Sequence, residues 1–231
     1  MDPATSPSTL PDLPTLILAV GALGTAAFGL VDAFKALPGG GVSRFGFKFV
    51  QQVIENLMPE STAPTDGGLS RDSLIFTLRS QWINGIALSD QVNIAKSLIK
   101  LRLTPDTAAG LAKVTGVDPT TLKQVAESMR TATPLTTPQS DVYGRFDLLL
   151  TTLLDQAYQR GEQRYRNAAK FYAVLVAVAL ALIANKYVVA HPIGMTGAVL
   201  LGLIATPIAP VAKDIASAIG TASKAIQAWK G

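Results

Sequence analysis

Few residues in this sequence have the types and spacing that chemistry at an active site requires. His191 is the only histidine among the 231 residues, and the chain contains no cysteine. A serine triad or a histidine metal site needs partner side chains beside the imidazole. We expect only a short loop and the N-terminal tail to lie on the same side of the predicted membrane helices as His191. The sequence therefore predicts a protein that is not an enzyme, with no catalytic residue, no metal ion and no cofactor.

Three consecutive glycines in LPGGGVSR, residues 37–44, are the second candidate for chemistry. A phosphate-binding loop requires a Lys-Ser or Lys-Thr pair after the glycines, or a strand before them, and the sequence offers neither. The glycines instead predict the end of a helix and a tight turn. Arg44 and Lys48 follow this turn, and we expect them to contact lipid headgroups.

The composition indicates a membrane protein. The chain is 48% hydrophobic and only 16% charged, with a mean hydropathy of +0.33, whereas soluble domains contain about 25% charged residues. A helix needs roughly 20 apolar residues to cross a bilayer. We predict an all-α integral membrane protein with three transmembrane helices, at residues 13–34, 167–189 and 193–212.

Charged residues lie at the ends of the predicted spans and suggest an orientation. Asp32 and Lys35 lie at the end of the first apolar segment. Because these charges lie at the edge of the span and not inside it, an ion path through the bilayer is disfavoured. The first fourteen residues contain two aspartates and no basic residue, so we expect a retained anchor and not a cleaved signal peptide. Basic residues gather after the first predicted span, before the second and after the third. Positive charge favours the cytoplasmic side, which predicts an outside tail at residues 1–12 and a cytoplasmic C-terminus.

A single helix is predicted to join the second span to a polar region. Residues 140–166 would form a cytoplasmic stalk helix that continues into the second span, about 70 Å in total length at 1.5 Å per residue. Gly144 and Gly161 are the positions where this helix could break. Its basic residues next to the span are predicted headgroup contacts: Arg164, Arg166 and Lys170.

Residues 39–138 predict a small cytoplasmic helical bundle that packs on the stalk or on a partner. Short amphipathic segments alternate with linkers, and we find no strand pattern. Helix N-terminal caps are expected at four residues: Ser70, Ser89, Thr104 and Asp118.

Small residues recur on the predicted membrane helices. They predict close helix packing through two sets, Gly21, Thr25 and Gly29 in the first span and Gly194, Ala198 and Gly202 in the third. Residues 213–231 form an amphipathic pattern, which we interpret as a helix on the membrane surface with Trp229 at the interface. Packing of this helix on a cytosolic partner is the competing interpretation.

Two C-terminal segments carry a resemblance. They are FDLLLTTLLDQAYQRGEQRYRNAAKFYAVLVAVALALIAN and GAVLLGLIATPIAPVAKDIASAI, and GLVDAFKALPGGGVSRFGF near the N-terminus also has the character of a family pattern. The chain resembles a group of bacterial multi-pass membrane proteins without an assigned function, in which a stalk helix leads into two spans and an amphipathic tail. The resemblance implies a bacterial cytoplasmic membrane and carries over no catalytic residue.

These observations predict a non-enzymatic membrane anchor or scaffold, as an accessory structural subunit of a larger complex. Its expected partners are membrane lipids and other protein subunits or further copies of itself, with no nucleic acid. The alternative is a component of an oligomeric channel or transporter. A membrane enzyme acting on lipid is a third possibility, for which the sequence offers no polar cluster.

Overall fold

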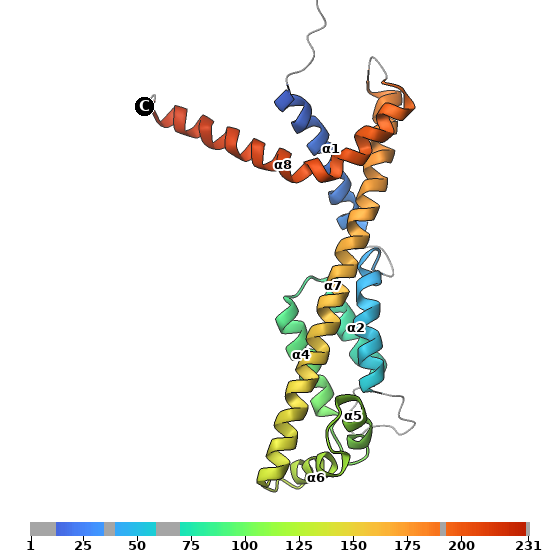
Figure 1. Ribbon diagram of the computed structural model, residues 1–231, viewed down its shortest axis with the longest axis vertical. Helices are drawn as coiled ribbons and strands as arrows, with labels where there is room; N and C mark the ends of the chain where they lie inside the picture. The colour runs from blue at the N-terminus through green and yellow to red at the C-terminus, as the bar shows by residue number, and fades with distance from the viewer. Residues whose placement is uncertain (1–12, 35–39, 59–69, 190–192, 230–231) are drawn as a thin grey trace, which may run out of the picture. The chain divides into compact units, whose positions relative to one another are not determined.

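The structure is a computed structural model that describes residues 13–34, 40–58, 70–189 and 193–229. Within these ranges the regular secondary structure is entirely helical, which confirms the all-α prediction. The predictions for residues 1–12, for Lys35 and for His191 fall outside the described ranges. The helices are α1 (Leu13–Ala33), α2 (Ser43–Leu57), α3 (Arg71–Ile83), α4 (Leu88–Leu101), α5 (Ala108–Thr115), α6 (Pro119–Arg130), α7 (Thr137–Tyr187) and α8 (Gly194–Trp229) (Figure 1).

Contacts divide the chain into two compact units, and α7 contributes to both. The first unit comprises Met1–Phe34 and Asn167–Gly231, and we call it the apolar unit. The second comprises Lys35–Arg166, and we call it the bundle unit. The long helix α7 has 51 residues and continues without interruption through Gly144 and Gly161, the two positions where the sequence allowed a break.

Among the described residues, three helices are long and apolar enough to cross a membrane, α1, α7 and α8, and the apolar unit contains α1, α8 and the part of α7 from Asn167 onward. Large side chains such as Leu175 and Leu200 are about half exposed on their outer faces. The buried positions are instead occupied almost entirely by small residues: Gly21, Gly24 and Ala27 on α1, Ala173, Ala177 and Ala181 on α7, and Ala198, Gly202, Ala205, Ala209 and Ala212 on α8. Small side chains allow the helix backbones to approach closely, as in other membrane helices.

The packing face of α1 differs from the predicted set of small residues. A Cβ on Gly24 would collide with the carbonyl oxygen of Ala205, so α1 and α8 touch through their backbones. Thr25 and Gly29 are exposed, and a Cβ on Gly29 would have no neighbour within 4 Å. The buried residues of α1 include steps of three residues, where the prediction used steps of four. Both steps keep small residues near one face of a helix, and the crossing direction of the partner helix selects between them.

On α8, the predicted set of small residues also divides. A Cβ on Gly202 would collide with the backbone of Val178 on α7, and Ala198 is buried. Gly194 is exposed at the start of the helix, where its φ of +80° favours glycine. Asn185 connects the two helices, because its Oδ1 accepts a hydrogen bond of 2.9 Å from the backbone N–H of Ile193.

Helix α8 is longer than the predicted third span. The sequence predicted a span ending at residue 212 and a separate amphipathic helix at residues 213–231, but one helix covers Gly194–Trp229. Pro207 and Pro210 lie inside it, and the helix changes direction where it passes α1 (Figure 1). Proline removes a backbone donor and bends a helix without necessarily ending it. The described side chains after residue 215 are exposed.

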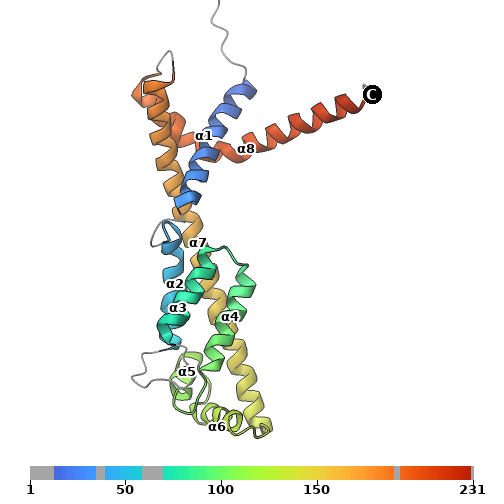
Figure 2. The ribbon, with the colours of Figure 1, turned by 180° about the vertical axis from the view of Figure 1, so that it is seen from behind.

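The bundle unit surrounds the first part of α7. Figures 1 and 2 show α2, α3 and α4 alongside this helix, with α5 and α6 near its N-terminal end. Four fully buried residues of α7 contribute to the core at a spacing of four: Phe146, Leu150, Leu154 and Tyr158. They belong to one hydrophobic core with apolar residues from all five shorter helices, so α7 is part of that core.

Two of the four predicted caps are present. Ser70 Oγ accepts a hydrogen bond of 3.1 Å from the Ser73 N–H, and Asp118 Oδ2 accepts one of 2.6 Å from the Thr121 N–H. The bond from Thr121 lowers the pKa of the Asp118 carboxyl, because it stabilises the ionised form.

The prediction for Ser89 is wrong, and the prediction for Thr104 is met only in part. Ser89 lies inside α4, whose N-cap is Ala87, because the Ala87 carbonyl already accepts from the N–H of Gln91. Thr104 Oγ1 accepts a hydrogen bond of 3.3 Å from the Thr107 N–H, as a cap does, and the Thr104 N–H donates one of 2.9 Å to Thr107 Oγ1. This turn comes before α5, which starts at Ala108 with Thr107 as its N-cap.

An ion cluster joins α4 to α7 at the edge of this core. Asp147 on α7 lies 2.8 Å from Lys100 Nζ and 3.5 Å from Lys96 Nζ. The hydrogen bond from Lys100 lowers the pKa of the Asp147 carboxyl below its ordinary value of 3.8. The ionised form therefore stabilises the fold above that value, and this contribution disappears as the pH falls through the lowered pKa.

Replacing Gly24 tests the packing of the apolar unit. We expect Gly24→Ala to lower the free energy of unfolding by about 1–3 kcal/mol, because the new methyl group meets the Ala205 backbone. Gly29→Ala is the matched control on the same helix and should not destabilise the protein. Thermal unfolding in detergent measures both variants, and equal midpoints for the two would contradict the described α1–α8 contact.

Replacing Asp147 tests the ion cluster. We expect Asp147→Asn to cost about 1 kcal/mol or less at pH 7, because the carboxylate is partly exposed and solvent screens it. The difference from the unmodified protein should shrink as the pH falls below 3.8. Asp155→Asn, an exposed carboxylate on the same helix, is the control. A difference that stays constant with pH would show that the charge is not the cause.

Candidate functional site

The candidate site lies where the backbones of α2 and α7 meet at a pair of glycines. A Cβ on Gly46 would lie 2.5 Å from the carbonyl oxygen of Gly161. A Cβ on Gly161 would in turn lie 3.0 Å from the carbonyl oxygen of Gly46. Contacts this short are not available to residues with side chains, so the two helices approach each other more closely than an alanine would permit.

Trp82, in the last turn of α3, covers this glycine pair. Its Cζ2 atom would lie 2.7 Å from a Cβ on Gly46. The indole N–H donates a hydrogen bond of 3.1 Å to the Ser43 carbonyl, which satisfies the one polar atom of the side chain. The ring centroids of Tyr158 and Tyr165 lie 6.2 and 6.4 Å from that of Trp82, and Tyr165 is nearly perpendicular to it. The indole therefore links α2, α3 and α7.

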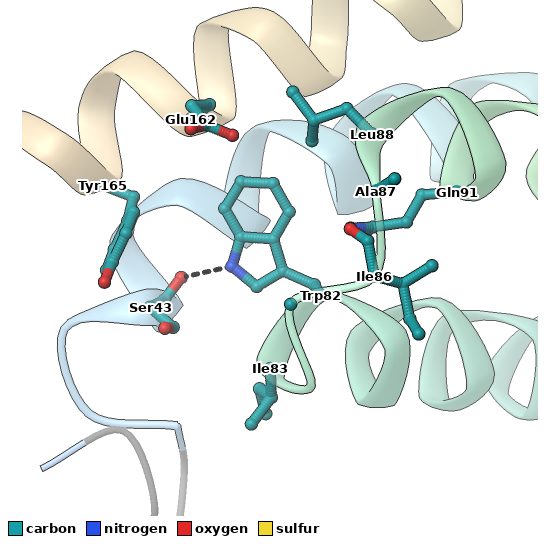
Figure 3. Close-up of a pocket in the computed structure, with 10 residues that line it drawn as sticks. Ser43, Trp82, Ile83, Ile86, Ala87, Leu88, Gln91, Glu162 and Tyr165 are labelled. Atoms are coloured by element: carbon teal, nitrogen blue, oxygen red, sulfur yellow. Dashed lines mark hydrogen bonds between the residues drawn. The ribbon is translucent and has the colours of Figure 1, made fainter. Parts of the chain in front are cut away.

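A cavity of about 280 Å³ opens beside the indole. Figure 3 shows Trp82 in the middle of the view, with Glu162 and Tyr165 from α7 on one side and the α3–α4 loop on the other. Gly85 in that loop has a φ of +69°, which favours glycine and allows the tight connection between the two helices. The lining residues are Ser43, Trp82, Ile83, Gly85, Ile86, Ala87, Leu88, Gln91, Glu162 and Tyr165.

Gln91 contributes a hydrogen-bond acceptor that has no partner. The side chain is 2% exposed, and its Nε2 donates a hydrogen bond of 2.6 Å to the Ile86 carbonyl. This bond fixes the amide orientation, because the reverse orientation would place two oxygens against each other. Oε1 of Gln91 is then buried without a partner among the described residues. Buried acceptors of this kind are rare and costly in folded proteins.

Glu162 brings a carboxylate to the same cavity. Both contacting nitrogens of Arg166, Nε at 2.7 Å and a terminal nitrogen at 2.6 Å, meet the same oxygen, Oε1. The side chain of Glu162 is 29% exposed, whereas that of Arg166 is 68% exposed. Oε2 of Glu162 has no partner among the described residues. The cavity therefore lies beside a buried amide oxygen without a partner and a half-used carboxylate, between apolar and aromatic walls.

The residues predicted to contact lipid headgroups are divided between the two units. Arg44 and Lys48 are exposed on α2, and the Arg164 guanidinium lies 5.5 Å from the ring centroid of Phe49. Arg166 pairs with Glu162 at the cavity. Lys170 on α7 and Trp229 on α8 belong to the apolar unit, where both are exposed.

The cavity was not predicted from the sequence. The usable signal was Gly46, a glycine inside an amphipathic helix, because such a residue usually marks a close backbone approach. Its partner Gly161 was interpreted as a weak point of a helix, and Gln91 was not singled out. Among the described residues, no three His, Cys, Asp or Glu side chains are grouped so that they could hold a metal ion.

Comparison of the chain with protein-family models, with curated proteins and with solved structures gives no match. The resemblance to a bacterial membrane-protein group therefore stays a prediction. A role for this chain has to be argued from its own residues and their geometry.

Replacing Gly46 tests the glycine contact. We expect Gly46→Ala to destabilise the bundle unit by about 1–3 kcal/mol, because the methyl group meets both the Gly161 carbonyl and the indole of Trp82. Gly144→Ala is the control, since a Cβ there has no neighbour within 4 Å. Thermal unfolding followed by circular dichroism measures the difference, and an unchanged midpoint for Gly46→Ala would contradict the described contact.

Proposed function

We propose that this protein is a multi-pass membrane anchor that holds a helical bundle at the membrane surface, as a structural subunit of a larger complex. The observation that carries the proposal is the exposed apolar surface of α1, α7 and α8. No more than 33% of the most apolar window of any of these helices is buried within the chain. Water would make this exposure costly, at about 25 cal/mol per Å² of apolar area, whereas lipid tails remove that cost.

Small residues between the helices support the same proposal. In lipid, apolar side chains gain little by leaving their surroundings, so membrane helices associate through close backbone contact. Gly24 against Ala205 and Gly202 against Val178 are contacts of this kind. A soluble three-helix bundle would instead bury large residues such as Leu200, which is 58% exposed here.

The exposed basic residues support the proposed orientation. Arg44 and Lys48 on α2 and Lys170 on α7 are exposed beside apolar segments, and positive charge favours the cytoplasmic side of a membrane. We therefore propose an external N-terminus, a cytoplasmic bundle unit and a cytoplasmic C-terminus. The exposed end of α8, with Trp229 96% exposed, supports an interfacial contact there.

Purification from native membranes in mild detergent, with the mass measured by light scattering, tests the structural role. A hetero-complex of fixed stoichiometry is the expected result. An isolated monomer without bound subunits would contradict the proposal. A homo-oligomer that conducts ions in liposomes would replace it with the channel alternative.

Single cysteines test the orientation, because the chain has none of its own. Tyr187→Cys lies at the end of α7, and Lys123→Cys lies on the exposed face of α6. On intact bacterial cells, a membrane-impermeant maleimide should label the first and should label the second only after permeabilisation. The reverse pattern would show that the proposed orientation is wrong.

A further inference from the structure

We propose that the cavity beside Trp82 binds a small organic cation, a protonated amine on a compact apolar body. The described residues that line this cavity all belong to the bundle unit, so the site does not depend on the membrane role proposed above. Three independent features of the lining point to this class of ligand.

The first feature is the buried acceptor on Gln91 that has no partner among the described residues. Its Oε1 is buried and accepts no hydrogen bond from the described residues. The side chain extends from α4 toward Trp82 and Ile86 (Figure 3). A buried acceptor gains most from a donor that enters with the ligand, because leaving it empty costs the full desolvation of that oxygen. An N–H of an amine supplies such a donor, and a hydrocarbon does not.

The second feature is the charge of the lining. Glu162 contributes a carboxylate, and none of the ten lining residues is a lysine or an arginine. Arg166 contacts only Oε1 of that carboxylate, so Oε2 is available to a ligand. Charge-assisted hydrogen bonds are roughly twice as strong as neutral ones, and this arrangement therefore favours a cation over a neutral donor and disfavours an anion.

The third feature is the aromatic and apolar wall. The rings of Trp82 and Tyr165 meet at 82° with centroids 6.4 Å apart, which forms a corner of two aromatic surfaces. Aromatic faces attract cations, and tryptophan does so best. Ile83, Ile86 and Leu88 provide apolar surface for the body of the ligand. The volume of about 280 Å³ lies just below the range of about 300–1,000 Å³ that is typical of small-molecule sites, so the ligand is compact.

Cyclohexylmethylammonium and its neutral analogue cyclohexylmethanol test the proposal with matched shapes. The full chain is used in mild detergent with Trp229→Phe, which leaves Trp82 as its only tryptophan. We expect the ammonium compound to give a saturable change in Trp82 fluorescence at pH 7. The alcohol should bind at least about tenfold more weakly, because it lacks the charge. Absence of saturation with the ammonium compound, or equal binding of the two compounds, would overturn the proposal.

Two cavity variants and a matched control locate the binding. Glu162→Gln keeps the shape of the side chain and removes its charge, and it should weaken binding of the ammonium compound about tenfold. Gln91→Met removes the unpartnered acceptor and should also weaken binding. Glu127→Gln is the control, because Glu127 forms a similar helix ion pair with Arg130 on α6 but does not line the cavity. Equal loss in Glu127→Gln and Glu162→Gln, or no loss in Glu162→Gln, would show that the ligand binds elsewhere.

Discussion

The close approach of two backbones at Gly46 and Gly161 is the constraint on which the bundle unit depends. Because neither residue has a side chain, α2 and α7 come close enough for Trp82 to cover both and to bond the Ser43 carbonyl. The indole then sets one wall of the cavity that Gln91 and Glu162 also line. A methyl group at either glycine would separate the helices and change this wall, so the shape of the site depends on the absence of a side chain at both positions.

The apolar unit applies the same rule to a different environment. Small residues again set the separation of the helices, at Gly24 against Ala205 and at Gly202 against Val178. In the bundle unit, however, large side chains such as Phe146 fill the core around the glycine contact. In the apolar unit the large side chains face outward, and close contact between backbones provides the packing.

Local signals in the sequence predicted the local features of the fold. Long apolar segments identified the three membrane-type helices, and Ser70 and Asp118 were recognised because a cap bonds only to its own helix. The prediction for Ser89 was wrong because α4 begins two residues earlier, where the Ala87 carbonyl accepts a hydrogen bond from the Gln91 N–H. The packing face of α1 and the cavity around Gln91 depend on residues far apart in the chain, and no local pattern specifies which of them meet.

The contribution of α7 to the core also constrains how the chain is made. A ribosome completes α2 to α6 before it reaches Phe146, the first of four α7 residues in their shared core. Until then these five helices expose apolar surface that has no cover, a state in which nascent chains are prone to aggregate. The same helix that closes the bundle continues into the apolar segment ending at Tyr187. The last of these four core residues, Tyr158, is therefore synthesised shortly before the apolar segment that ends at Tyr187.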